Sequence, residues 1–156
     1  MFKYSIELSD GRFLQAEANN NHLESISQYD ELHKGLEEGV HFALKIIKDG
    51  KEQVFPHHYQ NRIGGFALYP MPGCCGMVVS TATFLFPDFR GTEISVKFRE
   101  LKNNLAKHLG YSCMIATGIT DDVLSHKNLL KSNYEIVKNF TNSRTDNKLD
   151  IAVKVL

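Results

Sequence analysis

The clearest pattern in the chain is helical and lies between Ile94 and Gly110. Apolar residues recur at intervals of four, three, four and four positions, while polar side chains cover the opposite side; the apolar positions are Ile94, Phe98, Leu101, Leu105 and Leu109. This spacing places them on one face of an α-helix, and Gly110 favours its end. We therefore predict an amphipathic helix with one buried face.

Runs of β-branched and aromatic residues predict strands before and after this helix. The predicted strands are a hairpin over residues 2–14, single strands over 63–69, 77–86 and 111–117, and a final antiparallel pair over 134–141 and 149–156. Residues 42–55 suit a hairpin that turns at Asp49-Gly50, with a helix continuing through Ile47 as the alternative. Pro70 to Gly73 should be irregular, because proline and glycine suit neither regular state.

Two more segments have helical patterns. Residues 18–39 place apolar side chains at intervals of three and four, with Gly39 as a stop,. Residues 122–132 suit a shorter helix, for which Thr120, Asp121 and Asp122 are candidate N-caps,. The order of elements predicts a single α/β (α+β) domain over the 156 residues, with a mixed, mostly antiparallel sheet and helices on both of its faces.

Charge and composition narrow the classes of partner. The chain has 18 basic and 18 acidic side chains and no net charge when histidine is neutral. Proteins that bind nucleic acid or anionic membranes usually carry a basic patch, and no apolar run approaches the ~20 residues that span a bilayer. The three cysteines are too few for a disulfide framework and suit a reducing compartment,. We expect a soluble cytoplasmic protein with neither a nucleic-acid nor a membrane partner.

Two pairs of adjacent residues raise the question of a metal site. Cys74-Cys75 lacks the spacing with which two sulfurs converge on zinc, so a loop between strands is expected there,. His57-His58 lies in a polar stretch, where solvated side chains are expected. Cys113 falls on a predicted strand and should belong to the core. We predict no metal.

The junction between the strand over 77–86 and the following helix carries the main functional signal. The strand ends at Pro87, and a short turn containing Arg90 and Gly91 leads directly into the helix. The first N–H groups of a helix lack partners within it, and together with the positive end of the helix dipole they suit a phosphate. This pattern resembles the pyrophosphate loop of the GNAT superfamily of acyl-CoA N-acyltransferases, where a strand is followed by V-x-P-x-x-R-G-x-G-x-G and a helix.

A second segment extends the resemblance, which is greatest to small phage-type GNAT-like proteins. In residues 125–134, the end of the helix that contains His126 is followed by a step into the last strands at Tyr134, with Asn133 at the usual glycine position. Asparagine enters the left-handed conformation more readily than most residues. The resemblance implies a core acyl-CoA-binding part over 63–156 and a variable N-terminal part over 1–62.

The resemblance also implies acetyl-CoA as a co-substrate. Its pyrophosphate would contact Arg90 and the N–H groups of residues 91–95, and its pantetheine arm would pair with the backbone of residues 84–86. The implied binding residues are Phe84, Leu85, Phe86, Arg90, Gly91, Thr92, Glu93, Ile94, Ser95 and Asn128. The alternative is that Thr92 caps the helix and Glu93 complements its dipole, which would satisfy the helix N-terminus without a ligand.

Glu93 and Ser95 stand where the family's loop has its last two glycines. A carboxylate ~5 Å from a phosphate, at an effective dielectric near 20, repels it by roughly 3 kcal/mol. Each N–H bond to a charged oxygen contributes roughly 1.5–3 kcal/mol. We therefore expect a phosphate to bind this loop more weakly than it binds a glycine loop.

Acetyl transfer also requires groups that accept and donate a proton. The strand over 77–86 contains no carboxylate, and its polar side chains are Ser80, Thr81 and Thr83. Leu129 occupies the position of the tyrosine that protonates the thiolate in the family. His126 is the remaining candidate, because its ordinary pKa is close to neutrality; a solvated residue on an exposed helix face is the alternative.

These observations predict an N-acetyltransferase that moves the acetyl group directly from acetyl-CoA to a small amine or a protein amine. In a phage-encoded protein this would take place in the host cytoplasm. The alternative is a GNAT-fold protein without catalysis that serves as a binding or virion-associated component. A homodimer is a further candidate arrangement.

Overall fold

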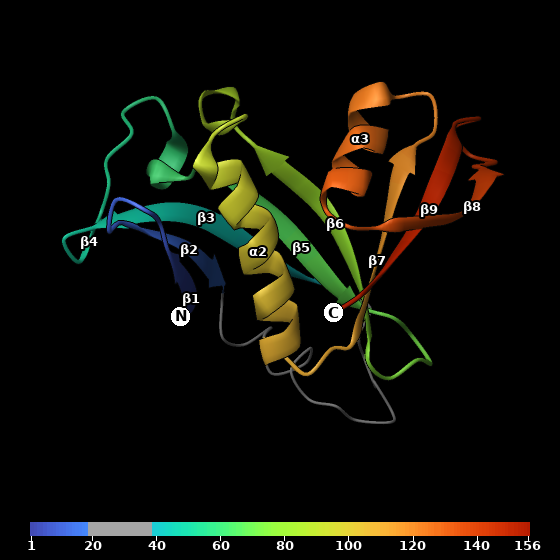
Figure 1. Cartoon of the computed structure of the whole chain (residues 1–156), viewed down its shortest axis with the longest axis horizontal. Helices are drawn as coiled ribbons and strands as arrows, with labels where there is room; N and C mark the ends of the chain where they lie inside the picture. Colours follow the sequence, from blue (N-terminus) through green and yellow to red (C-terminus); the bar gives the residue numbers. More distant parts are fainter. Residues whose placement is uncertain (19–38) are drawn as a thin grey trace.

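The computed structural model describes residues 1–18 and 39–156. They form a nine-stranded sheet in the order β1-β2-β3-β5-β6-β7-β9-β8, with the short β4 paired to β3 (Figure 1). The strands are β1 (Phe2–Glu7), β2 (Phe13–Ala18), β3 (Val40–Lys48), β4 (Lys51–Glu52), β5 (Gly64–Pro70), β6 (Met77–Leu85), β7 (Cys113–Ile119), β8 (Glu135–Thr141) and β9 (Lys148–Val155). The helices are α2 (Glu93–His108) and α3 (Val123–Lys131), with single 3₁₀ turns η1 (Tyr59–Asn61) and η2 (Pro87–Phe89).

The sheet is antiparallel except at its centre, where β6 and β7 run parallel. Parallel neighbours need a crossover connection, and here the crossover is α2, which follows β6 and precedes β7. Figure 1 shows α2 lying across the sheet and α3 standing beside β7. The mixed, mostly antiparallel sheet confirms the predicted fold class, while the helix predicted for residues 18–39 lies outside the described residues.

The hairpin of β3 and β4 decides between the two alternatives for residues 42–55. Buried and more exposed side chains alternate along β3, as expected for a strand with one face on the core. The turn at Asp49 and Gly50 has positive φ at both positions, 52° and 74°, which is the conformation of a tight two-residue hairpin. The hairpin is confirmed and the helix through Ile47 is wrong, although β4 ends at Glu52 and does not include residues 53–55.

The amphipathic helix is present as predicted. The five apolar positions of its periodic stripe are all buried: Ile94, Phe98, Leu101, Leu105 and Leu109. Thr92 caps the N-terminus, since its hydroxyl oxygen accepts the Ile94 N–H. Gly110 follows the helix with a φ of 94°, a conformation that glycine adopts without strain. Local periodicity and cap chemistry are therefore sufficient to define this helix.

Other element boundaries differ from the predictions by a few residues. Pro70 closes β5 instead of starting an irregular segment, and it pairs with Val78. Strand β7 runs over Cys113–Ile119, later than the predicted 111–117. Asp122 is the N-cap of α3 among the three candidates, accepting the N–H groups of Leu124 and Ser125.

The cysteine and histidine pairs partly follow the expectations. Cys74 and Cys75 lie in the turn between β5 and β6, as predicted, and all three cysteines are free thiols. Cys113 is only partly buried, although β7 is paired on both sides at this position, with Met77 and with Val155. His58 is not simply solvated: its ring packs 4.5 Å from the Phe86 ring and 5.7 Å from the Phe89 ring. Among the described helices, none is long and apolar enough to cross a membrane.

Candidate functional site: a gap between β6 and β7

The two central strands separate halfway along their length. β6 and β7 pair only over Met77–Val79 and Cys113–Ile115. Beyond Val79, β6 continues against β5 alone, and beyond Ile115, β7 continues against β9 alone. Figure 1 shows the two strands diverging from their shared end. The backbone edges that face each other past this point are therefore not paired with one another.

A bulge in β6 lies beside the separation. Gly65 pairs with Phe84 while Ala67 pairs with Thr81, so one residue of β5 lies opposite two residues of β6. Ala82, inside the bulge, has a φ of 50°, which is uncommon for a residue other than glycine. Bulges bend a strand and increase its local twist, so this bulge turns the second half of β6 away from β7.

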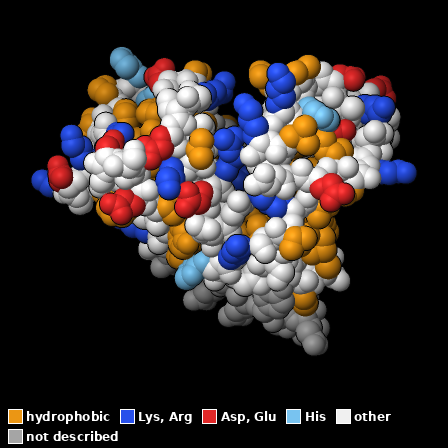
Figure 2. All heavy atoms as spheres, viewed as in Figure 1, with side chains coloured by type: hydrophobic (Ala, Val, Ile, Leu, Met, Phe, Trp, Pro, Cys, Tyr) orange, Lys and Arg blue, Asp and Glu red, His pale blue; other side chains and the backbone are white. Residues whose placement is uncertain are grey.

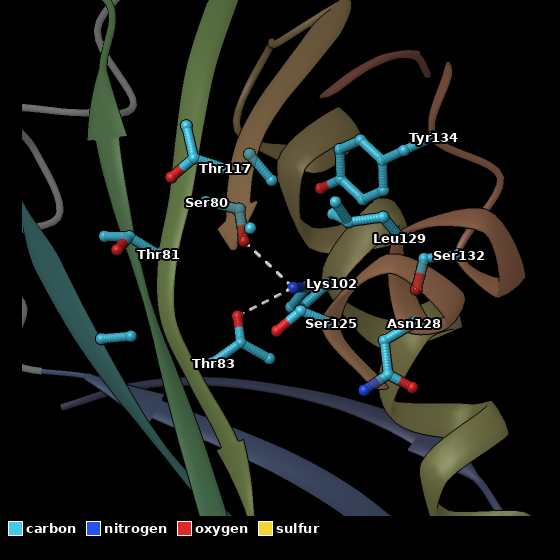
Figure 3. Close-up of a pocket in the computed structure, with 13 residues that line it drawn as sticks. Ser80, Thr81, Thr83, Lys102, Thr117, Ser125, Asn128, Leu129, Ser132 and Tyr134 are labelled. Carbon is cyan, nitrogen blue, oxygen red and sulfur yellow. Dashed lines mark hydrogen bonds between the residues drawn. The ribbon is translucent and has the colours of Figure 1, made fainter. Parts of the chain in front are cut away.

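The separation contains a cavity of about 330 Å³ (Figure 3). Its walls come from β6, α2, β7, α3 and the residue before β8. The lining residues are Ser80, Thr81, Ala82, Thr83, Lys102, Ala116, Thr117, Gly118, Ser125, Asn128, Leu129, Ser132 and Tyr134. Most of them are small or carry a hydroxyl group, so the channel offers both polar and apolar contacts, and Lys102 is the one charged residue among its described lining.

Lys102 reaches into this cavity from α2. Its ammonium donates hydrogen bonds to Ser80 Oγ at 3.0 Å and Thr83 Oγ1 at 3.1 Å. The same ammonium lies 5.9 Å from the Phe66 ring centroid and 5.7 Å from the Phe98 ring centroid. The residue keeps partial exposure to the cavity, yet protein atoms surround the ammonium. This burial, with a smaller contribution from the Lys154 charge, lowers the pKa of Lys102 to about 7.

Tyr134 forms the opposite wall. It is 6% exposed, and its hydroxyl has no hydrogen-bond partner among the described residues. Figure 3 shows the hydroxyl directed toward the space between Ser80 and Lys102. Burial raises the pKa of Tyr134 to about 12. The phenol therefore stays protonated at neutral pH and remains a hydrogen-bond donor.

Lys154 supports this wall from behind. It lies on β9, its ammonium is 5.0 Å from the Tyr134 ring centroid, and it donates to Asn103 Oδ1 at 2.9 Å. Burial, and then the charge of Arg99, lower the pKa of Lys154. Neither Lys102 nor Lys154 forms an ion pair with any carboxylate of the described residues. The centre of the molecule thus holds two basic groups without acidic partners.

The turn between β6 and α2 leaves part of its backbone unpaired. The Ile94 N–H is bound by Thr92 Oγ1, and the Ser95 N–H by the Thr92 carbonyl. No hydrogen bond among the described residues uses the N–H groups of Gly91, Thr92 or Glu93. Both alternatives from the sequence therefore apply in part, because Thr92 caps the helix while three N–H groups stay free at its start.

Arg90 is anchored beside these N–H groups. Its Nε donates to the Leu85 carbonyl at 2.7 Å, whereas its terminal nitrogens make no hydrogen bond or ion pair with the described residues. The Leu85 carbonyl is therefore already paired with Arg90. The Phe86 N–H is also paired, because it donates to the Ile63 carbonyl at 2.9 Å. The stretch of β6 that lines the cavity is residues 80–83, before the residues 84–86 expected from the resemblance.

Glu93 differs from the expectation most clearly. Its carboxylate accepts the Ser9 N–H at 2.7 Å and the Ser9 hydroxyl at 2.6 Å. Ser9 lies between β1 and β2, at the other end of the sheet from β7. These two bonds lower the pKa of Glu93 and hold its charge toward the N-terminal strands. The repulsion predicted between this carboxylate and a phosphate is correspondingly reduced.

His126 and Asn128 occupy different positions on α3. Asn128 lines the cavity, and its side-chain amide makes no hydrogen bond with the described residues. His126 does not line it: its Nδ1 lies 3.1 Å from Asp150 Oδ2, and its side chain is 43% exposed. Thr120 Oγ1 donates to the other oxygen of Asp150 at 2.9 Å. The position of His126 therefore does not support the expectation that it transfers protons in the cavity.

Basic side chains lie at a hollow in the surface although the whole chain carries no net charge. Figure 2 shows the surface hollowed between the parts of the molecule that carry α2 and α3, with Lys and Arg side chains on both sides of the hollow. Such a distribution favours an anionic ligand. Within the described residues, no group of three or more His, Cys, Asp or Glu side chains is placed to hold a metal ion.

Sequence reasoning missed Lys102 and Tyr134. Lys102 has the spacing of a solvent-facing residue on an amphipathic helix, and only the separation of β6 and β7 brings it to a cavity. The sequence pattern marks Tyr134 only as the aromatic residue that begins the last strands. The one available signal was that tyrosine carries a hydroxyl, which must find a partner when the ring is buried.

Solved structures that share this fold include GNAT acetyltransferases. A probable GNAT-family acetyltransferase from Chromobacterium violaceum has a TM-score of 0.63 and 9% identity over 91% of this chain and 82% of its own. A GNAT-family acetyltransferase from Elizabethkingia anophelis, solved with acetyl-CoA bound, has a TM-score of 0.63 and 12% identity over 92% and 98%. A GNAT-family acetyltransferase from Bacillus anthracis has a TM-score of 0.60 and 13% identity over 99% of this chain and 98% of its own. No protein-family model and no curated protein matches the sequence. The chain has the GNAT fold.

Proposed function

We propose that this protein is an acetyl-CoA-dependent N-acetyltransferase that transfers the acetyl group directly to a small amine or a protein amine. The observation that carries the proposal is that β6 and β7 pair only over Met77–Val79 and Cys113–Ile115 and then separate around a cavity, while the start of α2 keeps N–H groups without a hydrogen bond among the described residues. The GNAT fold and the acetyl-CoA bound to the Elizabethkingia anophelis protein support the same ligand.

The turn before α2 provides the phosphate end of the site. The N–H groups of Gly91, Thr92 and Glu93 and the free end of the Arg90 guanidinium would contact the pyrophosphate. Phosphates bind well at helix N-termini, where N–H groups and the dipole act together. The anchoring of Arg90 on Leu85 holds its guanidinium in place before the ligand arrives, which reduces the entropy lost on binding.

The channel provides the acyl end. Backbone groups of residues 80–83 on β6 and the free amide of Asn128 would hold the pantetheine arm. An N–H group in this part of β6 would polarise the thioester carbonyl, as N–H donors do in oxyanion sites. The amine would attack that carbonyl, form the amide bond and release the thiolate of CoA.

Calorimetric titration with acetyl-CoA tests the proposal. We expect binding, and we expect Arg90→Ala to weaken it roughly tenfold or more, because a charge-assisted hydrogen bond contributes roughly 1.5–3 kcal/mol. Arg144→Ala is the matched control, because Arg144 lies in the turn between β8 and β9. The absence of heat at millimolar acetyl-CoA would reject the proposal.

A GNAT-fold protein that binds a ligand without catalysis is the second candidate. It is favoured by one observation: no carboxylate occurs among the described residues that line the cavity. Binding of acetyl-CoA without thiol release in the presence of a panel of primary amines would support this candidate. Release of the thiol together with acetylation of an amine would reject it.

A further inference from the structure

Lys102 requires a partner that the described part of the chain does not supply. Its ammonium is held by two hydroxyl oxygens and two aromatic faces, with no carboxylate in contact. A buried cation is normally paired with an anion, because burial removes the water that would otherwise stabilise it. The open side of this ammonium faces the cavity between β6 and β7 (Figure 3). An anion that enters the cavity would complete the site.

The Tyr134 hydroxyl is an independent sign of a ligand at the same place. It is a buried donor without a partner among the described residues, and it is directed into the cavity beside Ser80. Nearly all buried polar groups in folded proteins have a hydrogen-bond partner. An orphaned donor and an uncompensated cation on facing walls indicate that an electron-rich atom binds between them.

The position of Lys102 and Tyr134 along the channel indicates which atom of the cofactor would lie between them. The gap closes where Val79 pairs with Ile115, and Ser80 is the next residue on β6. A cofactor whose phosphates bind at the turn before α2 and whose arm enters the cavity toward this closed end would bring its thioester to the region of Ser80. The sulfur becomes a thiolate only after the acyl group has left, which makes it the anion that the site needs.

We propose that Lys102 is the proton donor to the departing thiolate of CoA, and that the Tyr134 hydroxyl donates a hydrogen bond to the same end of the thioester. This inference rests on the proposed function. Ser80 lies between the two groups, accepts a hydrogen bond from Lys102 and keeps its ammonium directed into the channel. Neither role falls on the residues that the family resemblance suggested.

The chemical step balances without another reactant. The neutral acceptor amine forms a bond from its nitrogen to the thioester carbonyl carbon, and collapse of the adduct breaks the carbon–sulfur bond. The electron pair of that bond stays on sulfur, and the Lys102 ammonium transfers its proton to the thiolate. The new amide nitrogen loses one proton, and neutral Lys102 recovers one from solvent or from that nitrogen. The products are the amide and the thiol of CoA.

The charges around Lys102 suit a group that gains and loses a proton near neutrality. Burial and the Lys154 charge on β9 lower its pKa to about 7, and an effective acid or base has a pKa near the working pH. The facing residues of β6, β7 and α3 present Ser80, Thr117 and Asn128, which carry no charge. Tyr134 stays protonated because burial raises its pKa to about 12.

Titration of the thiol of bound CoA tests the proposal. Free thiols of this kind have a pKa of about 8.5, and a nearby cation lowers it. Ultraviolet absorption distinguishes thiolate from thiol, so the pKa of bound CoA can be measured as a function of pH. A thiolate beside Lys102 raises the pKa of the ammonium in turn, so the cation persists next to it. We therefore expect the thiolate to form at lower pH in the wild-type complex than in free CoA. In Lys102→Met the thiol should titrate at or above its free value, because burial then acts alone.

Two further variants separate the charge of Lys102 from its proton. Lys102→Arg keeps the cation but loses proton transfer, since arginine stays protonated; bound thiolate should still form early, whereas thiol release should lose the pH dependence of the wild type. Lys107→Met is the matched control, because Lys107 is exposed on the same helix. A thiol that titrates identically in the wild type and in Lys102→Met would overturn the proposal.

A measurement on the wild-type protein alone covers the case in which a variant fails to fold. Trace acylation by acetic anhydride, followed by mass spectrometry, reports the accessibility of each lysine. Bound CoA should reduce the labelling of Lys102 severalfold and leave Lys107 unchanged; equal labelling of Lys102 would overturn the inference. Wild-type protein that binds no CoA would reject the proposed function itself. Binding of CoA without protection of Lys102 would reject only this inference.

Discussion

Charged side chains are buried both in the N-terminal strands and around the central cavity, but only those in the N-terminal strands have oppositely charged partners. On β1, β2 and β3, the buried carboxylate of Glu17 lies 3.0 Å from the Lys45 ammonium and 3.8 Å from that of Lys3. Gln15 donates to the same carboxylate at 2.8 Å, and Glu52 contacts Lys45 at 2.6 Å. Every charge in this network has an opposite charge beside it.

By contrast, Lys102 in the cavity and Lys154 behind its wall have no carboxylate partner among the described residues. Lys102 and Lys154 meet hydroxyls, an amide and aromatic rings, and Tyr134 leaves its hydroxyl unpaired within the described structure. A complete network stabilises a fold by itself, whereas an incomplete one costs stability until something binds. We infer from this comparison that the buried charges of the N-terminal strands stabilise the fold, whereas those around the cavity serve to bind a ligand.

The pKa values report the same difference. Burial tends to lower the pKa of Lys45, but hydrogen bonds to Glu52 and Glu17 outweigh it and the pKa is raised. For Lys102 burial is unopposed, and the pKa falls to about 7. The presence or absence of a neighbouring carboxylate therefore decides the sign of the shift.

Glu17→Ala should have the largest effect on the fold. It removes the acceptor shared by Lys45, Lys3 and Gln15, and breaking a buried charge network is strongly destabilising. We expect the free energy of unfolding in urea to fall by about 2–4 kcal/mol. Glu52→Gln is the control, because Glu52 binds the same lysine from a more exposed position and should cost less than about 1 kcal/mol. Equal losses in the two variants would show that the network is not complete in the sense argued above.

Lys102→Met should raise the free energy of unfolding, and the size of this gain should depend on pH. The folded-state pKa of Lys102, about 7, lies below its ordinary value of 10.5. The unfolded chain therefore binds more protons between about pH 7 and 10.5, and wild-type stability should rise with pH across this window. The variant lacks this dependence. The stability it gains over the wild type should be larger at pH 6 than at pH 9, by about 1–3 kcal/mol.

Urea unfolding of both proteins without ligand at the two pH values measures this difference. Lys107→Met should change stability equally at pH 6 and pH 9, because Lys107 is exposed. If Lys102→Met instead destabilised the protein at pH 6, its ammonium would have to be paired in the ligand-free protein as Lys45 is, and the contrast between the two regions would fail.

The features that could be predicted from the sequence are those that depend on local signals. Helix α2 was predictable because its periodicity, its Thr92 cap and Gly110 are local signals. The turn at Asp49-Gly50 was predictable for the same reason. These features depend on residues only a few positions apart, so they need no knowledge of the rest of the fold.

The cavity depends on contacts between distant parts of the chain. Its shape follows from pairing that ends at Val79 and Ile115, which lie on strands separated by a helix. Lys102 meets Ser80 across 22 positions, and Glu93 meets Ser9 across 84. The family resemblance located the phosphate end, which is a local motif, but it could not assign the groups on the walls of the channel, because their neighbours are set by tertiary structure.

Tyr134→Phe should have the smallest effect on the fold, and its sign is the sharpest test of the comparison. Removing a buried hydroxyl that has no partner relieves a desolvation cost, whereas removing one that has a partner destabilises the protein. We expect the free energy of unfolding without ligand to rise by about 0.5–2 kcal/mol, while the affinity for acetyl-CoA falls. Tyr59→Phe, at a side chain that is 81% exposed, should change neither quantity. A loss of about 1 kcal/mol in Tyr134→Phe would mean that the hydroxyl is already satisfied in the free protein, and the cavity would then resemble the N-terminal network instead of differing from it.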